Sequence, residues 1–512
     1  MGKIWTGLAL SLTALAPAVG TPNDAPAPRT LPVIPAVREF QPAGTGVFHL
    51  GPGTRVRAGR GSAVEDEARL LAGQLQVPFG YDDAKGDGDG PAGPGDITLR
   101  LNGSAAEARQ GTAKSAGTVN ESYVLTARNG RVGIDAPTDA GAFYGTRTLL
   151  QTLRAGSGLP EGVIRDAPDR RQRGLLLDIA RKPFTRDWIE DRIRQLGDLK
   201  LNQLHLHFSD DQGFRIESSS HPEIVSRDHL SKADLAAIIA LAAQRHVTVI
   251  PEIDSPGHLG AVIRAHPDLQ LVNASGRALP GAIDISNAAS ARMVDDLTRE
   301  FAPLFPGPYW HLGGDEYQAL VVDDPESSYP QLVPPGGTVA EATTRWLNDR
   351  EAVARKFGKR TKAWNDGFIS TPRAVPDRDR EVEYWTGKEL GAREPEEYLN
   401  AGRKVVNLND EYLYYVLGEP NDFTYPTGER IYKEWTPAVV RGTRAVAPSL
   451  ATPARVLGGR FAVWCDQADA QSQDEVARGI RLPLNALAQK LWYPGTPPLS
   501  WPAFEALADK VG

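Results

Sequence analysis

The sequence predicts an α/β protein in which a small α+β domain precedes a (β/α)8 barrel. The chain has 512 residues, enough for two or three domains. From about residue 169 onward, eight short apolar runs alternate with amphipathic helical segments, a pattern typical of parallel βα units. The simplest closed arrangement of eight parallel strands is a barrel. Before residue 169 the segments do not alternate regularly, which indicates a separate domain.

Composition places the chain among soluble globular proteins. Hydrophobic residues make up 41% and charged residues 24% of the sequence, which excludes a disordered, collagenous or polytopic membrane protein. The net charge of −7 provides no basic field, so we expect no nucleic-acid partner. Cys465 is the single cysteine, which excludes an intramolecular disulfide and a four-cysteine zinc site.

The first twenty residues have the pattern of a secretory signal peptide. Lys3 precedes an apolar run over 4–16 that is too short to span a bilayer comfortably, and small residues follow over 18–20. A membrane anchor or a buried strand is the alternative interpretation. We expect cleavage near Gly20, a flexible Pro/Ala-rich leader over 21–31, and a secreted protein with no membrane partner.

Residues 32–168 are predicted to form the α+β domain. The Gly/Asp-rich stretch 80–96 indicates a surface loop, and a helix over 139–153 is expected to end the domain. Alternating strands are expected at 96–101, 123–126 and 132–135. We find no obvious catalytic chemistry in this part of the chain.

The barrel is predicted to occupy residues 169–512. A helix over 186–199 follows the first strand, and Ser231 with Asp234 has the pattern of a capping box for the next helix. The long connection over 409–458 lies at the barrel mouth, where long loops are usually functional. The expected strands are 174–179, 203–208, 247–252, 309–312, 361–364, 381–385, 403–408 and 460–464.

Polar and aromatic residues gather at the carboxyl ends of these strands, which is where barrel enzymes place their active sites. The residues in question are Asp178, Arg181, His205, His207, Asp210, Asp211, Glu252, Asp254, His258, His311, Asp315, Glu316, Trp364, Trp385, Tyr412, Trp464 and Asp466.

The stretch from Gly313 to Glu316 is the most informative of these. Its two glycines allow a tight turn and a close approach to a ligand. Successive acids in an extended turn point in different directions, so Asp315 and Glu316 do not suit the two opposed carboxylates of ordinary glycosidases. One acid is better suited to donating a proton while its neighbour orients or stabilises another group. The alternative is an Asp that caps a helix beside a solvated Glu.

Three tryptophans, Trp364, Trp385 and Trp464, end three different strands. Together they would form an aromatic box whose faces suit the C–H faces of a sugar or its N-acetyl methyl group. Core packing is the alternative for any one of them. A non-catalytic sugar-binding protein would keep this box but would need no proton donor.

A metal-dependent hydrolase is the rival enzyme class. His205 and His207 face one side of a strand with Asp210, Asp211 and His258 nearby, a set that could bind a metal ion. Both histidines lie within the strand rather than beyond its end. Burial in a hydrogen-bonded barrel core is therefore the interpretation we favour, and we expect no metal and no cofactor.

Four ordered motifs resemble glycoside hydrolase family 20, the β-N-acetylhexosaminidases. They are RGLLLDIAR at 173–181, HLHFSDDQGFR at 205–215, PEIDSPGH at 251–258 and HLGGDE at 311–316. The segment 140–145 also resembles the end of the family's small α+β domain. The resemblance covers nearly the whole mature chain.

The resemblance implies a retaining hydrolase whose substrate supplies its own nucleophile, the 2-acetamido oxygen, which closes an oxazolinium ring. Glu316 would be the general acid and then the base. Asp315 would hold the acetamido N–H and offset its developing positive charge, and Tyr412 would hydrogen-bond the acetamido oxygen. Asp210 and His258 would support Glu316 and tune its proton affinity.

The resemblance also implies the residues that bind the sugar. Trp364, Trp385 and Trp464 would wall the acetamido pocket, and Arg181 would bind sugar hydroxyls through its fork of donors. The substrate would be an oligosaccharide or glycan that contains N-acetylhexosamine.

Two positions depart from the family pattern. Asp466 stands where exo-acting members usually carry Glu, and Tyr414 stands where many relatives show Asp or Asn. A shorter acid and a different rim would leave room for a second sugar, as in the lacto-N-biosidase branch, which releases a Gal-GlcNAc disaccharide. The alternative is that Asp466 binds the same hydroxyls as the Glu after a small backbone shift. We expect an enzyme that removes terminal GlcNAc or GalNAc, with the disaccharide-releasing enzyme as the alternative. The sequence does not set the oligomeric state.

Overall fold

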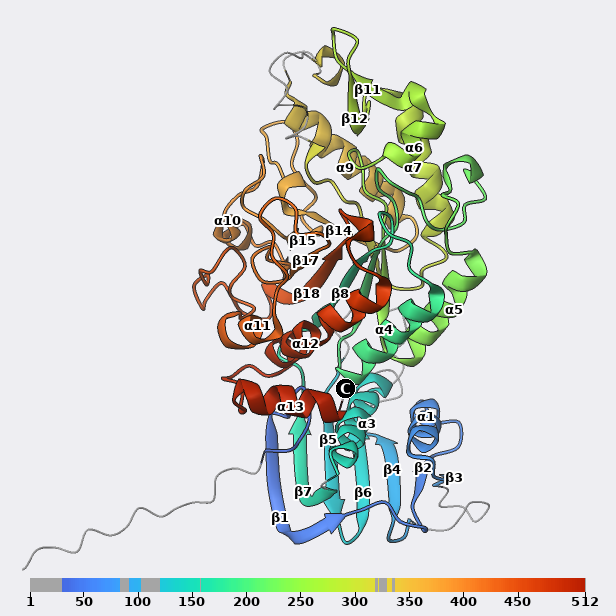
Figure 1. The fold of residues 1–512 in the computed structure, drawn as a ribbon, viewed down its shortest axis with the longest axis vertical. Helices are drawn as coiled ribbons and strands as arrows, with labels where there is room; N and C mark the ends of the chain where they lie inside the picture. The colour runs from blue at the N-terminus through green and yellow to red at the C-terminus, as the bar shows by residue number, and fades with distance from the viewer. Residues whose placement is uncertain are drawn as a thin grey trace, which may run out of the picture.

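The computed structural model describes residues 30–82, 92–102, 120–156, 158–317, 321, 329–333 and 337–511. It confirms the predicted fold class, because a closed barrel of eight parallel strands follows a smaller α+β domain. Figure 1 shows the smaller domain below the barrel, with the C-terminus between the two. The predicted signal peptide and residues 21–29 of the leader lie outside the described residues.

In the described residues the smaller domain is a mixed seven-stranded sheet with helices α1 and α3 packed against it. Its strand order is β1-β7-β5-β6-β4-β2-β3. The three strands and the helix predicted here correspond to β4, β5, β6 and α3, whereas residues 83–91 of the predicted loop lie outside the described residues. The elements are β1 (Glu39–Phe48), β2 (Arg55–Ala58), α1 (Glu65–Leu75), β3 (Phe79–Tyr81), β4 (Asp96–Leu101), β5 (Tyr123–Arg128), β6 (Arg131–Ala136), α3 (Asp139–Arg154) and β7 (Leu159–Asp166).

Helix α3 joins the two domains, because it is buried along almost its whole length. Thr138 caps its first turn, and a Cβ on Gly141 would lie 2.3 Å from the carbonyl oxygen of Ser122, so the helix packs unusually close to the sheet. Across the same interface the ammonium of Lys200 lies 3.2 Å from Asp166, and both side chains are buried. Buried, paired contacts of this kind fix the small domain against the barrel.

Each of the eight predicted barrel runs contains a strand. The barrel order is β8-β9-β10-β13-β14-β15-β16-β18, and pairing of β18 with β8 closes it. An additional strand, β17 (Tyr414–Val416), lies within the connection 409–458 and pairs in parallel with β18. The barrel strands are β8 (Gln172–Asp178), β9 (Gln203–His207), β10 (Thr248–Glu252), β13 (Tyr309–His311), β14 (Arg360–Trp364), β15 (Glu381–Tyr384), β16 (Val405–Asn407) and β18 (Val456–Trp464).

Helices surround the barrel, and their starts follow the sequence signals. Thr185 caps α4 (Arg186–Asp198), and the capping box of Ser231 and Asp234 begins α5 (Lys232–Gln244). The other elements are α6 (Gly260–Ala265), β11 (Gln270–Val272), β12 (Ala278–Ile283), α7 (Ala288–Phe301), α9 (Val339–Arg355), α10 (Pro395–Asn400), α11 (Gly428–Glu434), α12 (Gln473–Trp492), α13 (Trp501–Val511) and the 3-10 turns η1 (Pro222–Ile224), η2 (Pro267–Leu269), η3 (Pro330–Leu332), η4 (Asn365–Gly367) and η5 (Ala468–Ala470).

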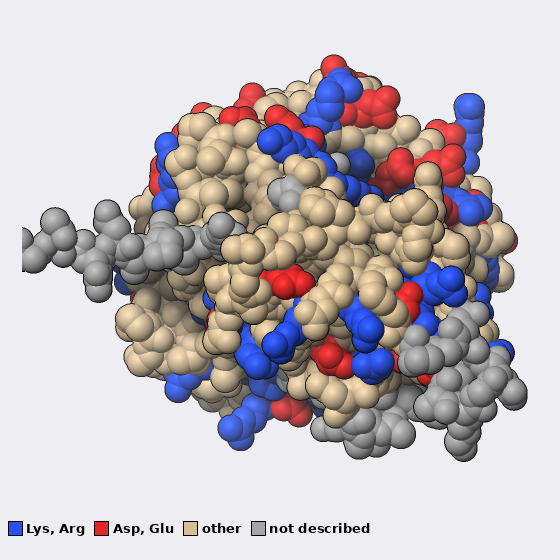
Figure 2. All heavy atoms as spheres, turned by 90° about the horizontal axis from the view of Figure 1, so that it is seen from below, with Lys and Arg blue, Asp and Glu red and all other residues tan. Residues whose placement is uncertain are grey.

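The apolar core lies between the strands and the helices, whereas the barrel interior is charged and paired. Arg460 binds Glu383, and Lys362 lies 2.6 Å from Glu381, all of them buried. At the small-domain end, positive and negative side chains are interspersed on the surface (Figure 2). No helix in the described ranges is long and apolar enough to cross a membrane.

Candidate active site

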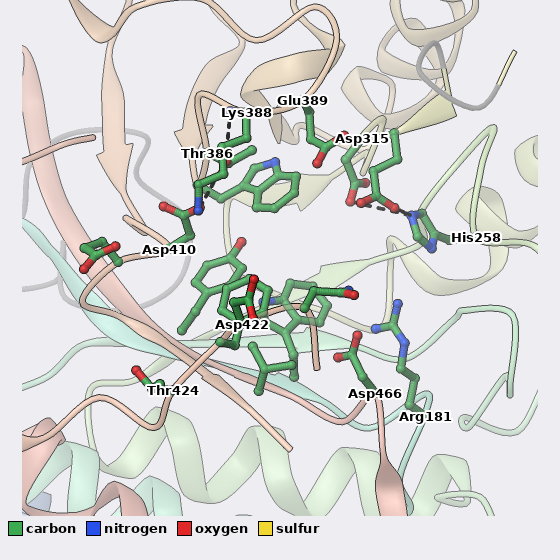
Figure 3. A pocket seen from close by; sticks show the side chains of 18 of the residues that line it. Arg181, His258, Asp315, Thr386, Lys388, Glu389, Asp410, Asp422, Thr424 and Asp466 are labelled. Carbon is green, nitrogen blue, oxygen red and sulfur yellow. Dashed lines mark hydrogen bonds and ion pairs between the residues drawn. The ribbon is translucent and has the colours of Figure 1, made fainter. Parts of the chain in front are cut away.

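The carboxyl ends of the barrel strands surround a pocket of about 660 Å³. In Figure 3, Asp315, His258 and Arg181 lie on one side of it and Asp410 and Thr424 on the other. Of the predicted site residues, the pocket is lined by Arg181, His258, Asp315, Glu316, Trp385, Tyr414, Trp464 and Asp466. The remaining three do not line it: Asp210 and Trp364 lie behind its wall, and Tyr412 lies elsewhere.

Glu316 is held by a histidine. Its Oε2 lies 3.2 Å from Nε2 of His258, whose Nδ1 lies 3.4 Å from Oδ1 of Asp210. The hydrogen bond from His258 holds the pKa of Glu316 below its ordinary value, although burial opposes this shift. Burial also opposes charge on His258, but the carboxylates of Asp210 and Asp315 raise its pKa well above the ordinary value. In the free protein the shared proton therefore sits on His258.

Asp210 is a buried carboxylate surrounded by donors. Its Oδ2 lies 2.8 Å from Nη2 of Arg181 and 2.7 Å from Nε2 of His207. Burial alone would raise the pKa of Asp210, but the charges of His258 and Arg181 and the bond from His207 hold it well below its ordinary value. Asp210 therefore stays ionised and orients His258 toward Glu316.

The backbone of the Gly313–Glu316 loop takes an unusual path. Gly313 has a φ of +68°, and a Cβ there would lie 1.7 Å from Oδ1 of Asp254. This close approach lets the N–H of Gly314 donate to the same Oδ1 at 2.8 Å. Glu316 itself has a φ of +56°, and its N–H donates to Oδ2 of Asp366 at 2.8 Å. Asp366 thus holds Glu316 in a backbone conformation that is uncommon outside glycine.

Asp315 lies between two other buried acids. Burial and the neighbouring charge of Asp254 raise the pKa of Asp315 well above its ordinary value. Burial raises the pKa of Asp254 to about 7, and burial with the charge of Asp315 raises the pKa of Asp366 to about 8. Oδ1 of Asp315 is buried and has no hydrogen-bond partner among the described residues. An N–H group or a positive charge beside Asp315 would satisfy this oxygen and relieve the repulsion.

Four aromatic rings form a cage beside these carboxyl groups. Trp385 stacks on Tyr414 with ring centroids 5.9 Å apart and planes 8° from parallel. Trp464 lies 6.0 Å from Tyr414 and 5.9 Å from Trp364. Trp364 is 1% exposed and donates through Nε1 to Glu252 at 2.7 Å, so it forms a fixed floor beneath Trp464. The cage presents broad apolar faces bordered by hydrogen-bonding groups, which suits an amide with a methyl group.

The structure corrects the position of the pocket tyrosine by two residues. The hydroxyl of Tyr412 donates to Glu434 at 3.2 Å, and Arg430 covers its ring at 4.4 Å. Tyr414 begins β17 and lines the pocket, and Val416 lines it from the same face of that strand. The difference arises because β17 exists only through its pairing with β18.

Arg181 and Asp466 form one end of the pocket. Nη1 of Arg181 lies 2.9 Å from Asp178, and its guanidinium carbon lies 5.5 Å from the ring centre of Trp464. Burial opposes charge on Arg181, but Asp178 and Asp210 outweigh it and raise its pKa. Burial raises the pKa of Asp466, an effect that the charge of Arg181 opposes. The arginine is thus fixed by carboxylates behind it while the aspartate faces the ligand space.

The two strand histidines of the metal alternative lie inside the barrel. Nδ1 of His207 lies 2.7 Å from Glu252, and its Nε2 is bonded to Asp210. Burial disfavours its charged form, but these two carboxylates raise the pKa of His207 to about 10, which leaves no lone pair for a metal ion. His205 stacks on Trp364 with ring centroids 6.0 Å apart. Nη1 of Arg460 lies 3.3 Å from Nδ1 of His205, so hydrogen bonds hold both rings inside the barrel.

Sequence reasoning missed Asp366 and the outer rim of the pocket. Asp366 follows Trp364 by two positions, and an acid just beyond a predicted strand was the available signal. The rim residues come from the loop after β15 and from the connection 409–458, in which they precede β17, follow it or lie in α11. Only the length of that connection indicated a function for the rim. The rim residues are Thr386, Lys388, Glu389, Asp410, Glu411, Asn421, Asp422, Phe423, Thr424 and Arg430.

Comparison with known families agrees with this geometry. The family model for the glycosyl hydrolase family 20 catalytic domain matches residues 171–494, and that for domain 2 of the same family matches residues 30–167. The chain belongs to glycosyl hydrolase family 20. Both regions of this family 20 protein are therefore accounted for by one known two-domain arrangement.

Individual relatives cover the chain to different extents. A lacto-N-biosidase from Bifidobacterium bifidum is 28% identical over 520 residues, which is 100% of this chain but only 44% of that protein. A β-N-acetylhexosaminidase from Cellulomonas fimi is 31% identical over 380 residues, 68% of this chain and 69% of that protein. The solved family 20 β-N-acetylhexosaminidase of Streptomyces coelicolor A3(2) shares the fold with a TM-score of 0.71 and 24% identity, covering 94% of both chains.

Proposed function

We propose that this family 20 protein is a retaining β-N-acetylhexosaminidase that hydrolyses terminal β-linked GlcNAc or GalNAc through an oxazolinium intermediate. One observation carries the proposal: Asp315 and Glu316 lie on one loop beside the aromatic cage, within a single pocket. A proton donor and an amide acceptor at adjacent positions suit a substrate whose own acetamido group attacks the anomeric carbon.

In the first step Glu316 protonates the leaving oxygen as the acetamido oxygen bonds to the anomeric carbon. The free protein keeps the proton on His258, 3.2 Å from Oε2 of Glu316. As the glycosidic bond breaks, this proton passes from His258 to Glu316 and from Glu316 to the leaving oxygen. In the second step a water molecule attacks the same carbon, Glu316 takes its proton, and the oxazolinium ring opens.

Asp315 and the cage prepare the acetamido group for this attack. The unpartnered Oδ1 of Asp315 accepts the acetamido N–H, and its charge offsets the positive charge that develops on the ring. Burial and the nearby charge of Asp315 raise the pKa of Tyr414 well above its ordinary value, so its hydroxyl stays protonated and can donate to the acetamido oxygen. Trp385 and Trp464, which line the pocket, pack against the methyl group.

The proposal is tested with 4-nitrophenyl β-N-acetylglucosaminide and β-N-acetylgalactosaminide. The wild-type protein should hydrolyse them, and Glu316→Gln should lower kcat on a β-N-acetylhexosaminide with a poor leaving group by at least about 10²-fold with the fold intact. Turnover by the wild type also excludes the non-catalytic sugar-binding alternative. No hydrolysis of any β-N-acetylhexosaminide, whether it ends in one sugar or in a disaccharide, would refute the proposal.

A second candidate is favoured by the size and shape of the pocket: release of a Gal-GlcNAc disaccharide. The pocket of about 660 Å³ lies within the range of about 300–1,000 Å³ that encloses drug-sized ligands, and a single N-acetylhexosamine is smaller than these. Its lining continues beyond the cage to Asp410 and Thr424. Asp466 is one methylene shorter than Glu, and Val416 supplies no hydrogen bond, so neither holds a terminal sugar tightly.

Product analysis separates the two candidates. The wild type is given one tetrasaccharide that ends in GlcNAc and another that ends in Gal-GlcNAc. Free GlcNAc from the first supports the hexosaminidase, and a disaccharide from the second alone supports the second candidate. Asp466→Glu is the matched variant, because the longer acid should shift hydrolysis toward the substrate that ends in GlcNAc.

We also propose that the protein is exported, on the strength of the pattern of its first twenty residues. Expression of the full chain in a bacterial host should place activity outside the cytoplasm, with a mature N-terminus near residue 21. Activity retained wholly in the cytoplasm would contradict export.

A further inference from the structure

The contacts behind Glu316 continue deeper into the barrel than His258 and Asp210. His207 lies 2.7 Å from Asp210 through Nε2 and 2.7 Å from Glu252 through Nδ1. The side chains of these three residues are at most 2% exposed. From Glu316 inward, acids and imidazole rings therefore alternate through five residues, each in contact with the next.

Glu252 also contacts the aromatic cage. Its Oε2 faces His207, and its Oε1 accepts from Nε1 of Trp364 at 2.7 Å. Strand register fixes this arrangement, because Glu252 on β10 pairs directly with His207 on β9. One buried carboxylate is thereby bonded both to the row of residues behind the proton donor and to the floor of the cage.

We propose that Glu252 and His207 are positioning residues that hold the proton donor and the acetamido cage in register with each other. His207 fixes Asp210, which aims His258 at Glu316, while Glu252 fixes His207 on one side and Trp364 on the other. This inference rests on the proposed function and adds to it two residues that do not touch the substrate.

The surroundings of His207 explain how it can do this. Glu252 faces it from β10, Asp210 from the loop after β9, and the edge of Trp464 packs against it at 5.0 Å from β18. Between two carboxylates the ring stays an imidazolium and donates to both. Without His207, Asp210 would keep Arg181 on Oδ2 but would lose a buried donor, and its carboxylate would be free to turn away from His258.

The leaving-group dependence of the reaction tests the branch through His207. His207→Phe keeps a ring of similar size and removes both hydrogen bonds. On methyl β-N-acetylglucosaminide, whose departure needs a proton, kcat should fall by about 10–100-fold. On the 2,4-dinitrophenyl glycoside, whose leaving group needs little protonation, the fall should be much smaller. A merely structural residue would lower both rates equally.

Glu383→Gln is the matched control. Glu383 is equally buried, and its carboxylate binds Arg460 and Lys362. It is the strand neighbour of Trp364, but among the described residues no hydrogen bond or ion pair joins its side chain to His207 or Trp364. This variant should lower Tm while leaving the ratio of methyl to dinitrophenyl rates unchanged. Should His207→Phe fail to fold, His207→Gln, which keeps one donor for Asp210, tests the same ratio at smaller amplitude.

Two substitutions at Glu252 test the branch to the cage. With Gln at this position the amide oxygen still accepts from Trp364, and the amide N–H can donate to Nδ1 of His207 once that ring is neutral, while Nε2–H of His207 keeps its bond to Asp210. Glu252→Gln should therefore keep most of the activity, whereas Glu252→Leu loses both bonds. Glu252→Leu should show the leaving-group effect and also lose discrimination between N-acetyl and bulkier N-acyl substrates. An unchanged leaving-group ratio in His207→Phe, or intact acyl discrimination in Glu252→Leu, would overturn the proposal. A wild type that hydrolyses neither these glycosides nor the corresponding β-lacto-N-biosides would instead contradict the proposed function.

Discussion

Tyr414→Phe removes one hydroxyl from the pocket and leaves the stacked ring in place. Tyr414 is 5% exposed, and its ring packs between Trp385 and Trp464. If its hydroxyl donates to the acetamido oxygen, its removal resembles the loss of one preorganised donor in a dry site. Such a loss costs about 2.7–4 kcal/mol, which corresponds to about 10²–10³-fold in kcat.

Tyr412→Phe is the matched substitution two residues away. It removes a hydroxyl that donates to Glu434, whose side chain is 55% exposed. The net contribution of such a hydrogen bond to stability is about 0.5–1.5 kcal/mol, and exposure favours the lower end. We therefore expect a small decrease in the free energy of unfolding and no change in kcat.

Both variants are assayed with 4-nitrophenyl β-N-acetylglucosaminide, or with the corresponding β-lacto-N-bioside if the second candidate holds, alongside thermal unfolding. Loss of activity in Tyr414→Phe with normal activity in Tyr412→Phe supports the geometry described here. The reverse result, with Tyr412 required and Tyr414 dispensable, would refute it and restore the prediction made from sequence.

Three further predictions concern the charges of the site. Asp315→Ala should lower kcat by at least about 10²-fold, measured on the same substrate, and an unchanged rate would remove Asp315 from the acetamido role. Asp315 acts as a carboxylate, so activity should rise with pH through its raised pKa. Asp254→Asn removes one cause of that raised pKa, while the amide oxygen of the new side chain still accepts from the N–H of Gly314. The acid limb of the kcat/KM profile should therefore move to lower pH in this variant. A limb that stays in place would show that Asp254 does not act on Asp315. Dialysis against EDTA should leave kcat unchanged, whereas a loss restored by Zn²⁺ would favour the metal-dependent alternative.

The barrel could be predicted because its strands carry their own signals. The run Leu175–Leu177 is apolar on both faces, as a buried parallel strand requires, and it ends at Asp178 where the sheet meets the pocket. Similar endings predict Glu252 and Trp364 at the same rim, but the structure buries both side chains behind the pocket wall. The capping box at Ser231 fixed a helix start in the same way.

The orientation of the pocket tyrosine could not be predicted, because it depends on tertiary pairing. The segment from Glu411 to Tyr415 contains three tyrosines, and nothing local distinguishes them. Tyr414 faces the pocket because β17 pairs with β18, where Tyr414 lies opposite Ala462. Tyr412 precedes this strand, in a turn that packs toward α11.

The interaction between the buried acids of the site could not be predicted from the sequence either. Asp254 follows β10 and Asp366 lies in η4 after β14, and they act on Asp315 only because closure of the barrel brings those strand ends to one place. Their raised pKa values result from burial and mutual repulsion, neither of which is encoded in spacing along the chain.

The central claim is that the substrate's own amide oxygen is the nucleophile, and a series of N-acyl substrates tests it most directly. Replacing the acetyl hydrogens one by one with fluorine weakens this oxygen as a nucleophile while changing the size of the group little. The account predicts that kcat/KM falls steeply at each step from acetyl to trifluoroacetyl. Rates that stay equal across the series would contradict it.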